Sequence, residues 1–139
     1  MKPVPVRDEE SAPFFDGALR GELMLLRCPA CRTFMSPTAY INVPLRPRCP
    51  ACFAPEPEWA PSGGRATLYS FAIMHQLYDE AFAADIPYPL AVVETEEGVR
   101  LNSQVVGCDN ERLEIGMPLE VTFDRVGDDV AIPRFRPAA

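Results

Sequence analysis

Cys28-Pro29-Ala30-Cys31 and Cys49-Pro50-Ala51-Cys52 are two matching stretches, and they decide how the chain around them folds. Residues 32–48 separate the two pairs, which fits the C-x2-C-x15–20-C-x2-C spacing of zinc sites. Each tight turn holds two thiolates, and two turns together fill the four corners of a tetrahedron around Zn²⁺. Because protein then occupies every position, the pattern predicts a structural metal and not a catalytic one.

Two alternatives to zinc follow from the same cysteines. The first is a pair of disulfides, but the opening residues 1–7 contain no apolar signal segment, so we expect a reducing, cytoplasmic environment. The second is iron, because tetrahedral thiolate sites accept either metal. Zinc is the favoured cofactor.

The charge of the chain is uneven. Its net charge is −7, with an isoelectric point near 4.7, which argues against a nucleic-acid binder held by phosphate contacts. No stretch approaches the roughly 18 apolar residues of a membrane span. Residues 20–48, however, contain one acid, Glu22, against five arginines: Arg20, Arg27, Arg32, Arg46 and Arg48. This basic segment suits contact with phosphate or carboxylate groups, although it is equally what a solvated ribbon surface would carry.

A short helix is predicted before the cysteines. It begins near Ser11, with a proline in its first turn, and ends at Gly21. A helix of this length is unstable alone and must pack on something, which can be another chain. The residues predicted to dock on such a partner are Phe14, Phe15 and Leu19.

The second part of the chain has the pattern of a small barrel. Strands are predicted at 65–74, 89–96, 99–106, 119–124 and 130–135, with a helical turn at 110–113 before the fourth strand. This order matches a five-stranded Greek-key barrel of the OB type, although an SH3-like barrel would look similar. The predicted fold is mainly β: a tail and docking helix at 1–21, a rubredoxin-like zinc ribbon at 22–60 and an OB-fold barrel at 61–139.

One connection of the barrel is unusually long. Residues 75–88 join the first two strands, where two to five residues are usual, and they are rich in apolar side chains, which is typical of a binding loop. The alternative is a lid over the barrel itself. His75, the single histidine, is expected to have a capping or interface role, and Cys108 is expected to be a small buried hydrophobe. No nucleophile–base pair is recognisable, so we expect no catalytic residues.

Taken together, the motifs resemble the zinc-ribbon plus OB-fold proteins of acyl-CoA metabolism. The resemblance spans residues 14–137 and rests on both knuckles and on five further stretches: 15–23, 64–70, 87–90, 115–119 and 135–137. One departure is the longer separation of the knuckles, which predicts an extra loop at 40–45. The resemblance implies a non-catalytic subunit of a thiolase-superfamily enzyme, or alternatively of a hot-dog-fold enoyl-CoA hydratase, in a heterotetramer or larger complex.

The resemblance also implies that the chain helps to form a channel for the pantetheine arm of a CoA ester shared with the partner. We expect the five arginines of residues 20–48 to meet the CoA phosphates or an acidic partner surface. The side chains expected to line the channel are His75, Leu77, Tyr78, Phe82 and Tyr88. A nucleic-acid-binding protein is the alternative of another class, since ribbons and OB folds both serve that role.

Overall fold

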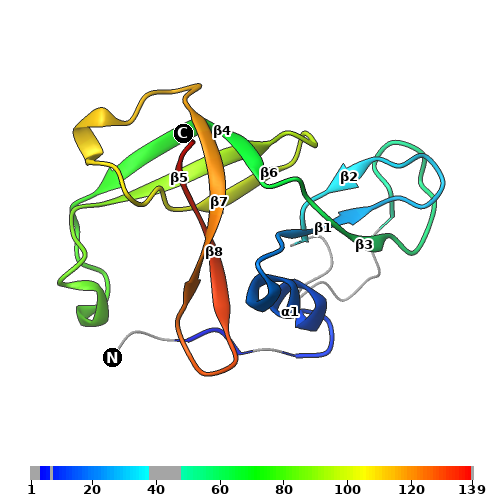
Figure 1. The fold of residues 1–139 in the computed structure, drawn as a ribbon, viewed down its shortest axis with the longest axis horizontal. Helices are drawn as coiled ribbons and strands as arrows, with labels where there is room; N and C mark the ends of the chain where they lie inside the picture. The colour runs from blue at the N-terminus through cyan, green and yellow to red at the C-terminus, as the bar shows by residue number, and fades with distance from the viewer. Residues whose placement is uncertain (1–3, 7, 38–47, 139) are drawn as a thin grey trace.

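The computed structural model describes residues 4–6, 8–37 and 48–138. It contains a three-stranded sheet at one end and a curled five-stranded sheet at the other, with helix α1 (Ala12–Arg20) beside their junction (Figure 1). Arg46 and the predicted extra loop at 40–45 lie outside the described residues. None of the described helices is long and apolar enough to cross a membrane.

Helix α1 has the predicted bounds. Gly21 ends it with a positive φ of 83°, which is the left-handed conformation typical of a C-cap glycine. At the other end the Ser11 hydroxyl does not cap the helix, because its oxygen accepts from the Asp8 amide at 3.0 Å while the hydroxyl donates to the Asp8 carboxylate at 2.9 Å. A Cβ on Gly17 would lie 2.3 Å from Cγ of Met24, so glycine allows the helix to approach the next strand closely. The helix thus packs on its own chain, against β1, β7 and β8.

The ribbon is built on a three-stranded antiparallel sheet. Its sheet has the order β2-β1-β3, formed by Phe34–Met35, Met24–Arg27 and Glu58–Pro61. Strand β3 follows two prolines, which by themselves are typical of a linker, but it pairs along the whole of β1, with Leu26 opposite Trp59. Local composition carries no signal for this strand because its pairing partner lies some thirty residues earlier in the chain.

Strand β1 and the residues directly before and after it contribute side chains to two hydrophobic clusters. Leu23 and Leu25 belong to the barrel core, whereas Leu26 and Cys28 belong to a small ribbon cluster that includes Met35 and Cys49. Leu25 and Leu26 are both fully buried. Because successive side chains of a strand point to opposite faces, one strand ties the ribbon to the barrel.

The barrel confirms the predicted OB-type topology. Its strands are β4 (Arg65–Met74), β5 (Tyr88–Thr95), β6 (Arg100–Ser103), β7 (Pro118–Arg125) and β8 (Ala131–Pro137), in the order β6-β5-β4-β7-β8. Short 3-10 turns, η2 (Glu80–Phe82) and η3 (Asn110–Arg112), lie in the connections. Val105 forms a parallel bridge with Phe135, where the two outer strands meet. Strand β6 is shorter than the predicted 99–106 because the chain leaves β5 after Ser103 to reach β8.

A hydrogen-bonded turn joins the ribbon to the barrel. The Glu97 carboxylate accepts from the Ser62 hydroxyl at 2.7 Å and from the Gly63 amide at 2.9 Å. The Ser62 hydroxyl oxygen in turn accepts from the Gly64 amide at 3.0 Å. The turn between β5 and β6 therefore anchors the connection from β3 to β4.

Candidate metal centre and ligand pockets

The four predicted ligands meet at one point. The sulfur atoms of Cys28, Cys31, Cys49 and Cys52 all lie within 4.8 Å of one another. Two pairs that join different knuckles are closer, with Sγ–Sγ distances of 3.6 Å for Cys28 and Cys52 and 3.5 Å for Cys31 and Cys49. A tetrahedron with metal–sulfur bonds of about 2.3 Å has edges of about 3.8 Å, whereas a disulfide needs about 2.05 Å. The cysteines are free thiols that fit a structural zinc ion.

The two knuckles are built in the same way. Cys28 accepts at its carbonyl from Arg32 at 2.9 Å, and Cys49 accepts from Phe53 at 2.8 Å. Each turn is closed by a residue with positive φ directly after the second cysteine: 70° for Arg32 and 64° for Phe53. Glycine adopts this conformation without strain, and neither position has one.

The thiols of the cluster have divergent acidities. The Thr33 hydroxyl, 3.1 Å from the Cys31 sulfur, is the main cause that lowers the pKa of Cys31 from 9.0 to about 6. For Cys52, the amide of Ala54 acts to lower the pKa, but the thiols of Cys28 and Cys31 together with desolvation raise it to about 12. Four thiolates this close repel one another, so full ionisation needs a bound cation. A dication such as Zn²⁺ supplies that charge.

The predicted arginines divide into paired and unpaired groups. Arg27 donates to Glu58 at 3.0 Å, and Arg20 lies 3.6 Å from Glu22, so both have an acid within the chain. Arg48 donates to a backbone carbonyl, that of Phe53, at 3.1 Å. Arg32 is exposed and has no ion pair in the described part of the chain. None of these four arginines lines either of the pockets described next.

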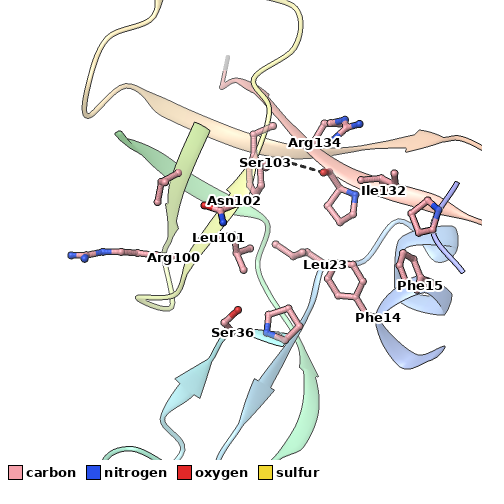
Figure 2. Close-up of a pocket in the computed structure, with 15 residues that line it drawn as sticks. Phe14, Phe15, Leu23, Ser36, Arg100, Leu101, Asn102, Ser103, Ile132 and Arg134 are labelled. Carbon is pink, nitrogen blue, oxygen red and sulfur yellow. Dashed lines mark hydrogen bonds between the residues drawn. The ribbon is translucent and has the colours of Figure 1, made fainter. Parts of the chain in front are cut away.

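An apolar pocket of about 350 Å³ lies at the seam between β6 and β8, where α1 and β1 cover the barrel. Figure 2 shows Phe14, Leu23 and Leu101 converging on it, while Arg100 points away. The Arg100 guanidinium instead lies 3.9 Å from the centre of the Tyr69 ring. Phe14 also packs against the barrel core. The Phe15 ring contacts the Phe14 ring edge to face, with 5.3 Å between the ring centres. Two of the predicted docking residues thus contact their own chain, and Leu19 is 38% exposed.

A wider groove of about 1000 Å³ lies beside the long loop. Of the predicted channel residues it contains Phe82 and Tyr88, together with Val106 and Arg134. Leu77 and Tyr78 are exposed on the same loop, which projects from the end of the barrel in Figure 1, and His75 is exposed without lining the groove. The structure therefore brings two of the five predicted channel residues, Phe82 and Tyr88, together in one groove.

Residues outside the predicted sets also reach these sites. Arg134 lines both the pocket and the groove, and Phe53 is 71% exposed at the tip of the second knuckle. The CxxC pattern places Phe53 directly after a ligand and would have singled it out, whereas nothing in the sequence places Arg134 beside residues 82–88. Cys108, expected to be buried, is half-buried against the barrel core.

Comparison with known proteins assigns the fold to a family. A family model described as "ChsH2, C-terminal OB-fold domain" matches residues 59–124. A "DUF35 domain-containing scaffold protein" of Methanothermobacter thermautotrophicus is 36% identical over 104 residues, which are 74% of this chain and 72% of that protein. A solved structure titled "Ltp2-ChsH2(DUF35) aldolase" contains a chain of 31% identity with a TM-score of 0.78, and the match covers 98% of this chain and 100% of that one.

A longer relative is also similar. A "Probable enoyl-CoA hydratase alpha subunit" of Thermomonospora curvata is 31% identical over 138 residues, which are 99% of this chain but 40% of that protein. The present chain therefore spans about two fifths of the length of that relative.

Proposed function

Because the chain belongs to the DUF35 family of scaffold proteins, we propose that it is a non-catalytic auxiliary subunit of a thiolase-superfamily enzyme acting on a CoA ester. The enzyme would be a thiolase or a thiolase-like aldolase, assembled as a heterotetramer or larger complex in the reducing cytoplasm. The observation that carries the proposal is the match, over 98% of this chain and 100% of the other, to a chain of a structure titled as an aldolase.

The chemistry of the described residues supports a role without catalysis. A nucleophilic cysteine needs a base and a lowered pKa. The single histidine, His75, is exposed, and the Cys108 thiol donates to the carbonyl of Asp109 at 3.4 Å instead of to a base. The four remaining cysteines would be saturated by a structural metal. The catalytic groups would then reside on the partner.

The groove beside residues 75–88 is our candidate for the pantetheine channel. Phe82, Tyr88 and Val106 give it apolar walls, which suits a thin and weakly polar arm. Arg134 adds a cation that has no ion pair in the described part of the chain, although Asp85 and Asp124 line the same groove, and it is our candidate for the group that meets an anionic end of the ligand. The five arginines of residues 20–48 stay candidates for the CoA phosphates or for the partner, with Arg27 the weakest because Glu58 already neutralises it.

The hydratase is the second candidate partner. The relative from Thermomonospora curvata, named as a probable enoyl-CoA hydratase alpha subunit, carries additional sequence beyond the part that matches this chain. The two partners differ in the reaction they perform: thiolytic or retro-aldol cleavage of a carbon–carbon bond for the first, and addition of water to an enoyl-CoA for the second.

Co-expression distinguishes these possibilities. The chain is produced in turn with thiolase-like and with hydratase-like proteins of its own organism, and each purified complex is assayed for CoA-ester cleavage and for enoyl-CoA hydration. We expect a stable complex with cleavage activity that neither protein has alone. A chain that binds neither protein would contradict the auxiliary role, and a complex that only hydrates would replace the thiolase-type partner by the hydratase.

A further inference from the structure

We infer that the tip of the zinc ribbon, formed by Arg32, Arg48 and Phe53, is the surface that docks onto an acidic face of the catalytic subunit. The inference rests on the proposed function and names the part of this chain that makes the contact. We refer to these three residues as the knuckle tip.

The first argument is that two residues of the knuckle tip have a strained backbone but side chains that are not buried within the chain. Arg32 and Phe53 occupy equivalent positions in the two knuckles and both have positive φ, 70° and 64°. This conformation costs a residue with a Cβ roughly 1–2 kcal/mol, and glycine avoids the cost. A residue other than glycine is retained at such a position where either its packing or its function requires the side chain. Packing within the chain does not require these two side chains, because Arg32 is exposed and Phe53 is 71% exposed.

The second argument is that the three side chains share one end of the ribbon. Arg32 and Phe53 each follow a cysteine directly, and the sulfurs of those two cysteines lie within 4.8 Å of each other. Arg48 is held beside Phe53 by its hydrogen bond to the Phe53 carbonyl at 3.1 Å. The knuckle tip thus contains one exposed aromatic side chain and two exposed arginines, with Arg48 bonded to the backbone of Phe53. Aromatic and arginine side chains are the residue types that dominate binding energy at protein interfaces.

The third argument is charge, and it decides the nature of the partner. Within the described residues neither Arg32 nor Arg48 has an ion pair, and Glu56, the acid nearest to Phe53 in sequence, pairs with neither of them. The knuckle tip is thus a local cation on a chain whose net charge is −7. An acidic protein face with an apolar hollow for the ring complements it, and a planar guanidinium binds carboxylates in a bidentate manner.

The test exploits opposite effects on stability and on binding. Phe53→Gly removes both the ring and the strain, so we expect the ribbon to bind zinc about fivefold more tightly in a chelator competition, which corresponds to roughly 1 kcal/mol of released strain. The same variant should raise at least tenfold the dissociation constant for the thiolase-superfamily subunit identified by co-expression. Phe53→Ala should weaken binding equally without the gain in zinc affinity. Ile115→Ala, which removes an exposed apolar side chain from the barrel, is the matched control and should change neither quantity.

The charge argument has its own measurement. Arg32→Gln and Arg48→Gln should slow association with the catalytic subunit and reduce its dependence on salt. If both leave assembly intact but raise KM for the CoA ester, the arginines contact phosphate and the inference is overturned. It is also overturned if Phe53→Gly binds the subunit as wild type does, or if the arginine variants lose affinity only for single-stranded DNA. If the wild-type chain binds no catalytic subunit, the proposed function fails first, which separates the two failures.

Discussion

Leu25 and Leu26 offer a direct test of the shared strand, because they are adjacent, equally buried and assigned to different clusters. Both have 0% exposure, but Leu25 lies in the barrel core and Leu26 in the ribbon cluster. Replacing a fully buried leucine by alanine costs about 2–5 kcal/mol, with the higher values where the surroundings cannot collapse into the cavity. We therefore expect Leu25→Ala to lower the free energy of unfolding of the barrel by about 4 kcal/mol, which is a large share of the roughly 5–15 kcal/mol of a typical domain.

Leu26→Ala should act on the metal site instead. The ribbon cluster is small, with four buried residues of which two are cysteine ligands, so it can relax more than the barrel core, and we expect a loss of about 2–3 kcal/mol. Because folding and metal binding are coupled in such a ribbon, this loss should appear as zinc binding that is about 30- to 150-fold weaker. Wild-type protein should bind one zinc ion per chain.

The assay uses a reporter that the chain already contains. Trp59 is the single tryptophan and packs against the ribbon cluster, so its fluorescence follows the ribbon, while far-ultraviolet circular dichroism follows the sheets. Urea titrations by both probes, with and without zinc, separate the two effects. If the two substitutions shift both transitions by the same amount, the ribbon and the barrel are a single cooperative unit and our division of β1 is wrong.

Three further predictions concern the metal centre, the connection and the helix. Thr33→Val should raise the pKa of Cys31 in the metal-free protein, because the Thr33 hydroxyl is the main cause of its lowered value. The folded value of about 6 lies below the ordinary 9.0, so the ionised thiol stabilises the fold above pH 9, and this stabilisation is lost as the pH falls through about 6. Ultraviolet absorbance of the thiolate should show that the variant loses its thiolate at a higher pH than the wild type. Glu97→Ala should lower the free energy of unfolding by about 1–3 kcal/mol in a urea titration, because the Ser62 hydroxyl and the neighbouring amide lose their acceptor; an unchanged midpoint would show that water replaces the carboxylate. Phe15→Ala should weaken association with the catalytic subunit at least tenfold by calorimetry, whereas an unchanged dissociation constant together with a lower unfolding midpoint would assign Phe15 to packing within the chain.

Short stretches of sequence were sufficient to predict the metal ligands and several elements of the fold. The sequence alone predicts the four metal ligands in the two CxxC stretches, the end of α1 at Gly21, the bounds of β4 at 65–74 and a strand at 119–124. Each of these signals acts over a few residues: the geometry of a CxxC turn, the φ of a glycine, and the period of two of a strand. The order and number of the barrel strands then restricted the topology to very few folds, and the OB type was among them.

The remaining features arise from contacts between segments far apart in the chain. Strand β3 exists because Trp59 and its neighbours pair with β1, although the prolines before it are typical of a linker. Arg27 is neutralised by Glu58 across the same pairing, which no count of charges along the sequence could show. Arg134 lines a groove with residues 82–88 because the barrel closes β8 against β6. Pairing and burial depend on which surfaces meet in space, so they could be read only once the sheets had been assembled.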